Sequence, residues 1–281
     1  MDPTVVSTVE ELDRALMPAR LANSPVSYVP TMGAMHGGHA ALLQQGRRLG
    51  DALIASIFVN PTQFGPGEDI ERYPRPLEDD LEMCGREGVD IVFVPEVETI
   101  HPDGAGGVTI DPGPLGAVLE GVSRPTHFRG MLTVVAKLFA LVRPSTAVFG
   151  EKDYQQLALV RRMVHDLSMA IDIVGVATVR DADGLALSSR NRYLDAAQRE
   201  HALALSGALS AGAARAWDGS GAVLAAAHEV LDKAEDVDLD YLALTDRDLA
   251  PDPRAGEARL LVAARIGTTR LIDNVGLVLE R

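Results

Sequence analysis

Two histidines stand close together in the segment Val29–His39, directly after the first strongly apolar run of the chain. His36 and His39 are three residues apart, with two glycines between them. Unpaired backbone N–H groups at a helix start favour anions, and glycines let a phosphate approach the backbone closely. The two imidazoles could then act as neutral donors to phosphate oxygens. Helix capping, packing or a metal site are the alternatives, although the further ligands that zinc needs are not obvious in the sequence.

Two side-chain amides follow the next apolar run, in the segment Phe58–Gly65. Asn60 and Gln63 are polar at a point where the preceding residues are apolar. Their amides could bind a hydroxy acid through its hydroxyl and its carboxylate. A turn in which Asn60 and Pro61 only satisfy backbone groups is the alternative.

A lysine and a hydroxyl-rich loop come later in the chain. Lys152 follows an apolar run and could bring a mobile cation to the edge of a sheet, although an isolated lysine is ordinarily a solvated one. Ser188, Ser189 and Arg190 follow a turn and could wrap triphosphate oxygens, with the guanidinium neutralising pyrophosphate. Taken alone, a Ser-Ser-Arg sequence is also common surface composition.

The elements around these residues alternate between strand and helix. A capping-box pattern of Ser7 and Glu10 predicts that a first helix begins there. Apolar runs predict strands at residues 26–29, 53–59, 91–94, 147–149 and 171–179. Helical periodicity is present at residues 40–49, 77–87, 132–142 and 155–167. Such alternation predicts an α/β fold, a parallel sheet with helices on both faces, whose ligands bind beyond the carboxyl ends of the strands.

The last hundred residues have a different pattern. Two helical stretches are expected at 195–217 and 221–234, followed by strand-like runs near Tyr241, Leu260 and Leu277. We therefore predict a Rossmann-like domain over residues 1–178 and a smaller C-terminal α+β domain over residues 179–281. Gly104 to Gly107 are expected to form an exposed loop.

Composition limits the class of protein. The net charge of −14 opposes a broad nucleic-acid or anionic-membrane surface. Cys84 is the one cysteine and cannot form an internal disulfide, which favours a reducing compartment. The sequence shows neither a signal-peptide core nor an apolar run of the roughly 20 residues that a membrane span needs. We expect a soluble, cytoplasmic protein that binds neither nucleic acid nor membrane.

The four motifs, in this order and at these spacings, resemble the pantothenate synthetase (pantoate–β-alanine ligase) family of HxGH-type nucleotidyltransferases. The resemblance covers nearly the whole chain, because residues 73–75, 124–130 and 270–274 also look like family signatures. It implies a Rossmann-like fold, a homodimer, the use of ATP and Mg²⁺, and condensation of pantoate with β-alanine through pantoyl adenylate.

The resemblance also implies roles for individual residues. Catalysis would fall to His39, His36 and Lys152, and the substrates pantoate and β-alanine would be held by Gln63, Gln156 and Asn60. The ATP site would comprise Met32, Gly33, Ala34, Met35, His36, Gly37, Gly38, His39, Gly150, Glu151, Lys152, Asp153, Val179, Leu187, Ser188, Ser189 and Arg190. The protein ligands of Mg²⁺ stay unknown: Asp79 and Asp80 are candidates, but acidic residues in the first turn of a helix are the expected reading.

One residue departs from the family pattern, and two segments leave questions open. Thr62 stands where the family commonly has Met, which could alter the packing of the pantoate pocket. Residues 65–69 are a candidate lid over the hydrolysable intermediate. Another nucleotidyltransferase of the same fold, a tRNA synthetase fragment and a nucleotide-binding regulatory module without turnover are the rival interpretations. The acidic charge and the lack of an anticodon-binding domain disfavour the second.

Overall fold

The computed structural model describes residues 2–104 and 107–280, in two compact units. The first unit comprises residues 1–150 and 159–176, and the second comprises residues 151–158 and 177–281. The predicted domain boundary after residue 178 stays a prediction, and the units differ from it in grouping residues 151–158 with the C-terminal part. Within the expected loop 104–107, Ala105 and Gly106 lie outside the described residues.

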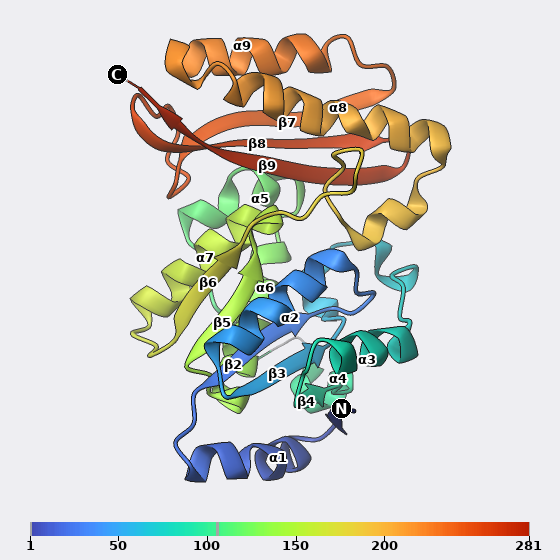
Figure 1. The fold of residues 1–281 in the computed structure, drawn as a ribbon, viewed down its shortest axis with the longest axis vertical. Coiled ribbons are helices and arrows are strands. Elements are labelled where there is room, and N and C mark those ends of the chain that lie inside the picture. Colours follow the sequence, from blue (N-terminus) through green and yellow to red (C-terminus); the bar gives the residue numbers. More distant parts are fainter. Residues whose placement is uncertain (1, 105–106, 281) are drawn as a thin grey trace. The chain divides into compact units, whose positions relative to one another are not determined.

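The first unit is built on a six-stranded parallel sheet (Figure 1). Its strands are β1 (Thr4–Val6), β2 (Val26–Thr31), β3 (Ala52–Ile57), β4 (Ile91–Phe93), β5 (Thr146–Gly150) and β6 (Asp172–Val176). The strand order is β1-β4-β3-β2-β5-β6. Strands β3 and β4 lie on one side of β2, whereas β5 and β6 lie on its other side, so the strand order reverses between β2 and β5. In open α/β sheets, ligands bind beyond the carboxyl ends of the strands at such a reversal.

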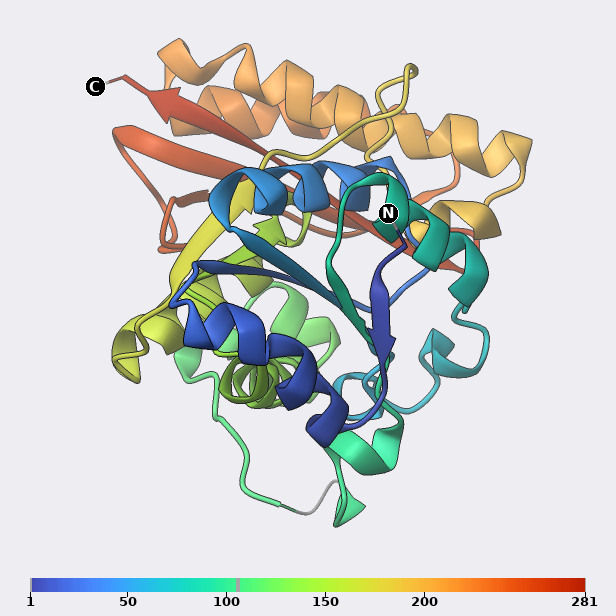
Figure 2. The ribbon, with the colours of Figure 1, turned by 60° about the horizontal axis from the view of Figure 1, so that its bottom comes forward.

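Helices cover both faces of this sheet. The helices are α1 (Val9–Leu21), α2 (Gly37–Leu49), α3 (Leu77–Arg86), α4 (Val97–Ile100), α5 (Glu120–Ser123), α6 (His127–Val142) and α7 (Tyr154–Asp166). Figure 2 shows α2 on one face and α1 beside α6 on the other. Apolar side chains bury the four inner strands β4, β3, β2 and β5 most completely, with Val29, Leu43 and Leu53 fully enclosed, whereas the edge strands β1 and β6 are partly exposed. The predicted fold class is therefore confirmed for this part of the chain.

The second unit contains a three-stranded antiparallel sheet with two helices on one face (Figure 1). Its elements are α8 (Ala196–Ala213), α9 (Ser220–Leu231), β7 (Val237–Asp246), β8 (Gly256–Ile266) and β9 (Thr269–Leu279). The strands follow the order β7-β8-β9, and their inward-facing side chains form one apolar core with α8 and α9. This is the small α+β arrangement that the sequence predicts.

Two local expectations are corrected by the structure. The first helix begins one residue later than predicted, because the capping box is formed by Thr8 and Glu11: Thr8 Oγ1 accepts the Glu11 N–H, and Glu11 Oε2 accepts the Thr8 N–H. Strand β1 was not predicted, since it has three residues of which two are exposed, and only its pairing with β4 defines it.

Candidate active site

The two histidines of the first motif lie at the start of α2, in the first unit. His36 is the N-cap residue, and its Nδ1 accepts the N–H of Gly38 at 3.1 Å. His39 Nδ1 accepts the His36 N–H at 3.2 Å, and the two ring centroids are 4.2 Å apart. Because Nδ1 is an acceptor in both rings, each neutral imidazole carries its proton on Nε2. The caps therefore select the tautomer in which both rings can donate from Nε2.

A buried aspartate shapes the loop that precedes these histidines. Asp80, on α3, is only 1% exposed, and its two carboxylate oxygens accept the N–H groups of Ala34 at 2.8 Å and of Met35 at 2.6 Å. Gly33 has a φ of +79°, and a Cβ there would lie 2.8 Å from Asp80 Oδ2. The carboxylate thus fixes a tight backbone that glycine permits. Sequence reasoning placed Asp80 in a helical first turn, where it is, but did not identify this contact.

The Gln63 side chain is held by a group of neutral hydrogen bonds in the first unit. Asn60 Nδ2 donates to Gln63 Oε1 at 3.1 Å and to the Gly130 carbonyl at 3.2 Å. Asn60 Oδ1 accepts from Thr62 Oγ1 and from His101 Nε2, both at 2.9 Å. These contacts fix the orientation of the Asn60 amide, with Oδ1 as the acceptor and Nδ2 as the donor. The Gln63 atom that faces Asn60 Nδ2 must therefore be the acceptor Oε1. The Gln63 Nε2 group then remains as the donating end of that side chain, 2.9 Å from the sulfur of Met32.

The backbone of the same turn is also fixed. The carbonyl of Gln63 accepts from His127 Nδ1 at 2.8 Å. Gly130, on α6, lets the turn approach the helix closely, because a Cβ there would lie 2.0 Å from the Thr62 carbonyl oxygen. Asn60 itself is buried, with both ends of its amide engaged in these contacts. Its predicted direct contact with substrate stays a prediction, and its visible role is to orient Gln63.

Burial keeps the two histidines of this group neutral. Burial, followed by the positive charge of Arg124, lowers the pKa of His127 to about 4. Burial and then the ammonium of Lys137 lower the pKa of His101 as well. Both rings are therefore uncharged donors near neutral pH.

An ion pair between Glu68 and Arg124 anchors the candidate lid, residues 65–69, in this structure. Glu68 accepts from Arg124 Nη2 at 2.5 Å and from Arg124 Nε at 3.0 Å. Burial opposes ionisation of Glu68, but the hydrogen bonds and charge of Arg124 outweigh it and lower the pKa of the carboxyl. Movement of residues 65–69 as a lid stays a prediction.

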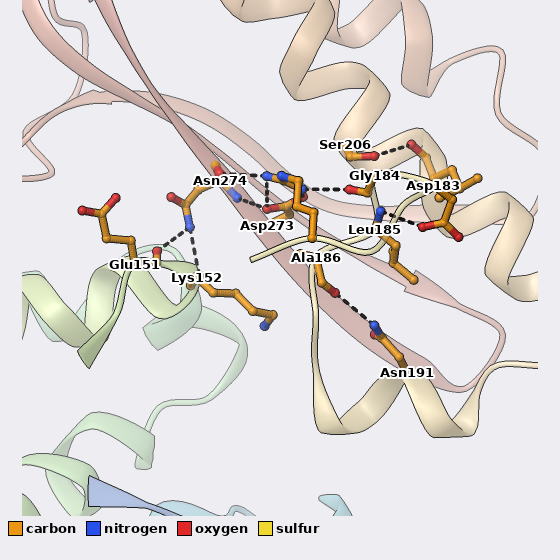
Figure 3. Close-up of polar contacts among 12 residues, drawn as sticks. Glu151, Lys152, Asp183, Gly184, Leu185, Ala186, Asn191, Ser206, Asp273 and Asn274 are labelled. Atoms are coloured by element: carbon orange, nitrogen blue, oxygen red, sulfur yellow. Dashed lines mark hydrogen bonds and ion pairs between the residues drawn. The ribbon is translucent and has the colours of Figure 1, made fainter. Parts of the chain in front are cut away.

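Lys152 lies in a 3₁₀ turn, Glu151–Asp153, which follows Gly150 at the end of β5 and belongs to the second unit. The side-chain amide of Asn274, on β9, donates to the carbonyl oxygens of Glu151 and of Lys152 (Figure 3). The first turn of α7 follows at once and contains Gln156, partly exposed, beside the buried Gln155.

The predicted phosphate loop also lies in the second unit. The Leu187 N–H donates to the Val179 carbonyl at 2.9 Å, so these two predicted site residues are adjacent. Ser188 caps a 3₁₀ turn, Ser189–Tyr193, through an Arg190 N–H bond of 3.3 Å, and Ser189 is buried. The hydroxyl and guanidinium groups are therefore carried on an ordered turn.

Across residues 2–104 and 107–280, no group of three or more His, Cys, Asp or Glu side chains is arranged to hold a metal ion. In the same part of the chain, no helix is both long and apolar enough to cross a membrane.

The fold and its strand-end motifs define an α/β enzyme of the nucleotide-binding kind. The chain belongs to the pantoate–β-alanine ligase family, whose model matches residues 4–276. It is 57% identical over 278 residues to the pantothenate synthetase of Nocardia farcinica, covering 99% of this chain and 85% of that protein. It is 56% identical over 270 residues to the pantothenate synthetase of Mycolicibacterium smegmatis, covering 96% of this chain and 85% of that protein.

Solved structures agree with this assignment. A crystal structure of pantothenate synthetase from Thermus thermophilus superposes with a TM-score of 0.91 at 48% identity, over 97% of this chain and 98% of that one. The pantoate–β-alanine ligase of Francisella tularensis, crystallised with β,γ-ATP and β-alanine, gives a TM-score of 0.81 at 32% identity, over 97% of each chain. The predicted family, fold class and enzyme class are confirmed.

Proposed function

We propose that this chain condenses pantoate with β-alanine, using ATP and passing through pantoyl adenylate, to give pantothenate, AMP and pyrophosphate. The observation that carries the proposal is the family match over residues 4–276, combined with the histidine pair whose caps fix both rings as Nε2 donors. A carboxylate and an amine do not condense in neutral water, so the carboxylate needs a leaving group, and AMP provides it.

In the first step, the pantoate carboxylate attacks the α-phosphorus of ATP in line and pyrophosphate leaves. His36 and His39 donate from Nε2 to phosphate oxygens, and the backbone of residues 32–38 approaches the triphosphate. Lys152 and Arg190 neutralise charge on the transferring and leaving phosphates, together with the hydroxyls of Ser188 and Ser189. The contribution of the protein is therefore positioning and charge stabilisation.

The pantoate site is proposed around Gln63 and Gln156. The Gln63 Nε2 group would donate to a carboxylate or hydroxyl oxygen, since Oε1 of that side chain is already paired with Asn60. The hydrogen bonds from Thr62 and His101 to Asn60 would keep this polarity fixed. Thr62 thus replaces the Met that is common in the family with a hydroxyl that contributes to the orientation of Asn60.

Mg²⁺ is proposed to bind mainly through ATP. This ion prefers phosphate oxygens and water, with one or two carboxylates. Each oxygen of Asp80 accepts a backbone N–H group, whereas Asp79, the preceding residue of α3, is exposed and is the better candidate. When bound, the ion would neutralise charge on the β- and γ-phosphates.

In the second step, the neutral amine of β-alanine attacks the acyl carbon of the adenylate and expels AMP. We further propose a homodimer in the cytoplasm, as the family resemblance implies. The buried Cys84 thiol, whose pKa burial raises to about 12, fits a structural cysteine in a reducing compartment.

The test is release of pyrophosphate from ATP and Mg²⁺ at substoichiometric enzyme. Pantoate should be required, and sustained turnover should need β-alanine as well. Release with another acid or with a phosphate ester, but not with pantoate, would be compatible with the fold but would show that pantoate is not the substrate. Release that is independent of any added acid would reject the ligase.

A further inference from the structure

Asn274 has its whole side-chain amide engaged with the Lys152 turn and with a neighbouring arginine. Its Nδ2 donates to the carbonyl oxygens of Glu151 and of Lys152, each at 2.9 Å (Figure 3). Its Oδ1 accepts from Arg259 Nη1 at 3.0 Å. Asn274 is buried, so these bonds are shielded from competing water. Two donors and one acceptor on one short side chain are what asparagine offers and alanine or leucine do not.

The same arginine gives the turn a second fixed point. Arg259 contacts Glu151 Oε2 through Nη1 at 3.3 Å and through Nη2 at 3.2 Å. Its guanidinium carbon also lies 3.8 Å from the ring centroid of Tyr154. The backbone that carries Lys152 is therefore held by Asn274 and Arg259, while the Lys152 side chain itself extends away from Asn274 (Figure 3).

Asp273, the preceding residue of β9, holds a different segment. Successive side chains of a strand point to opposite faces. The Asp273 carboxylate pairs with both terminal nitrogens of Arg180, at 2.6 and 2.9 Å, and is almost fully buried. Arg180 Nη1 also donates to the carbonyl of Gly184 at 3.1 Å. Asp273 thereby fixes the base of the turn from which the chain continues to Ser188 and Arg190.

We propose that Asp273 and Asn274 are positioning residues for the adenylation step: Asn274 places the Lys152 backbone, and Asp273, through Arg180, places the segment leading to Ser188–Arg190. The proposal rests on the proposed function, since it assigns both segments to the triphosphate. Two adjacent residues of one strand would then set the geometry of both phosphate-contacting segments. A bidentate arginine–carboxylate pair and a doubly donating amide are suited to this, because both restrict orientation as well as distance.

The test separates the two half-reactions. Asn274→Ala should lower pantoate-dependent pyrophosphate release by about 10- to 100-fold, by analogy with the loss seen when a partner that orients a metal ligand is removed. Aminolysis of pantoyl adenylate supplied ready-made, which needs no triphosphate contacts, should proceed at the wild-type rate. Asp240→Asn is the matched control, because it removes the Arg270–Asp240 ion pair between β7 and β9 of the same sheet. The control should leave both half-reactions unchanged.

Asn274→Asp provides a second variant of nearly the same size. It keeps an acceptor for Arg259 but loses both donors to the turn, and it should show the same selective defect. Wild-type adenylation by either Asn274 variant, or equal loss of both half-reactions with a lowered melting temperature, would overturn the proposal.

Backbone hydrogen exchange tests the positioning itself without any assumption about turnover. Asn274→Ala should increase exchange selectively at residues 151–155, and Asp273→Asn at residues 181–190. Both variants should also bind ATP more weakly than Asp240→Asn. Unchanged exchange in these segments would overturn the proposal even if the enzyme were active. Failure of the wild-type protein to release pyrophosphate with pantoate would count against the proposed function alone.

Discussion

The Gln63 turn and the Lys152 turn are both 3₁₀ turns that follow a strand of the parallel sheet, but they are stabilised by different forces. The Gln63 side chain is held through Asn60 by neutral hydrogen bonds from His101 and Thr62, and the Gln63 carbonyl accepts from His127 at 2.8 Å and, more weakly, from Arg124 at 3.3 Å. The Lys152 turn is held by the Asn274 amide and by an arginine that is paired with Glu151. Under the proposed function, the Gln63 turn binds a small hydroxy acid and needs fixed polarity, whereas the Lys152 turn meets a triphosphate and must also carry charge.

The difference has consequences for how each turn responds to mutation and pH. Losing a neutral orienting bond should weaken binding of pantoate, while losing a cation should slow a step in which charge develops. Acid should affect the histidine-held turn most directly.

Removing the Lys152 ammonium should produce the largest loss. Lys152→Ala should lower the rate of adenylation by about 10²- to 10³-fold, the cost of removing one transition-state donor, while the KM for pantoate changes little. Single-turnover measurement of pyrophosphate release gives the rate. Lys233→Ala is the matched control, because that lysine forms an exposed i,i+4 pair with Glu229. A wild-type rate of adenylation in Lys152→Ala would show that the Lys152 ammonium does not stabilise charge in that step.

Acidification should destabilise the region around the Gln63 turn through His127. The pKa of His127 is about 4 in the folded protein, below its ordinary value of 6.5, so the unfolded chain binds more protons between these values. Above pH 6.5 the neutral state of His127 makes its full contribution to the free energy of unfolding, and about 3 kcal/mol of that contribution is lost as the pH falls to 4. Urea unfolding of the wild-type protein and of His127→Gln at several pH values measures this.

The His127→Gln variant should lack this component of the pH dependence. The introduced glutamine would retain a donor for the Gln63 carbonyl but would not titrate, so the two proteins should differ in slope between the folded and the ordinary pKa of the histidine. His165→Gln, at an exposed position, should behave like the wild type. Equal slopes for wild type and His127→Gln would show that His127 is not held neutral by the fold.

Removing the His101 donor should weaken pantoate binding moderately. His101→Leu takes away one of the hydrogen bonds that orient Asn60, worth about 1.4 kcal/mol, or a tenfold rise in the KM for pantoate. The KM for ATP should not change. His101→Gln, which can again donate, should recover part of the affinity. A lower kcat with an unchanged KM for pantoate would contradict the orienting role.

Removing the Thr62 hydroxyl should have the smallest effect. Thr62→Val is nearly isosteric and deletes only the 2.9 Å bond to Asn60 Oδ1, which is worth about 1 kcal/mol. The KM for pantoate should rise about fivefold. Thr245→Val, in the second unit, is a control for loss of a part-buried threonine bond. An unchanged KM for Thr62→Val would mean that His101, the Thr62 backbone N–H and the Gly130 carbonyl suffice to orient Asn60.

Local signals in the sequence predict much of the fold. Periodicity indicated five of the six strands of the parallel sheet, the small C-terminal domain and the longer helices, because these elements carry recognisable apolar patterns, whereas the four-residue helices α4 and α5 were not predicted. Strand β1 was missed because two of its three residues are exposed, whereas the equally short β4 is fully buried. The exact first cap was missed because two neighbouring capping boxes differ by one position. Strand order and the reversal at β2 and β5 come from long-range pairing and are visible only in the structure.

The candidate site likewise contains residues that local motifs reveal and residues that only the structure reveals. Motifs singled out His36, His39, Gln63 and Lys152, because glycine, histidine and lysine at strand ends are locally recognisable. The residues that orient them are distant in sequence: Asp80 lies 46 residues from Ala34, and Asn274 lies 122 residues from Lys152. No local pattern marks such partners, although the family-like segment at residues 270–274 did point to Asn274.

Exchange of labelled pyrophosphate into ATP tests the adenylate mechanism most directly. The two-step mechanism predicts exchange that requires pantoate and Mg²⁺, proceeds without β-alanine, and is lost in Lys152→Ala. Such exchange shows that pantoate reacts reversibly with ATP before the amine arrives. Exchange without pantoate, or none until β-alanine is added, would contradict the two-step mechanism.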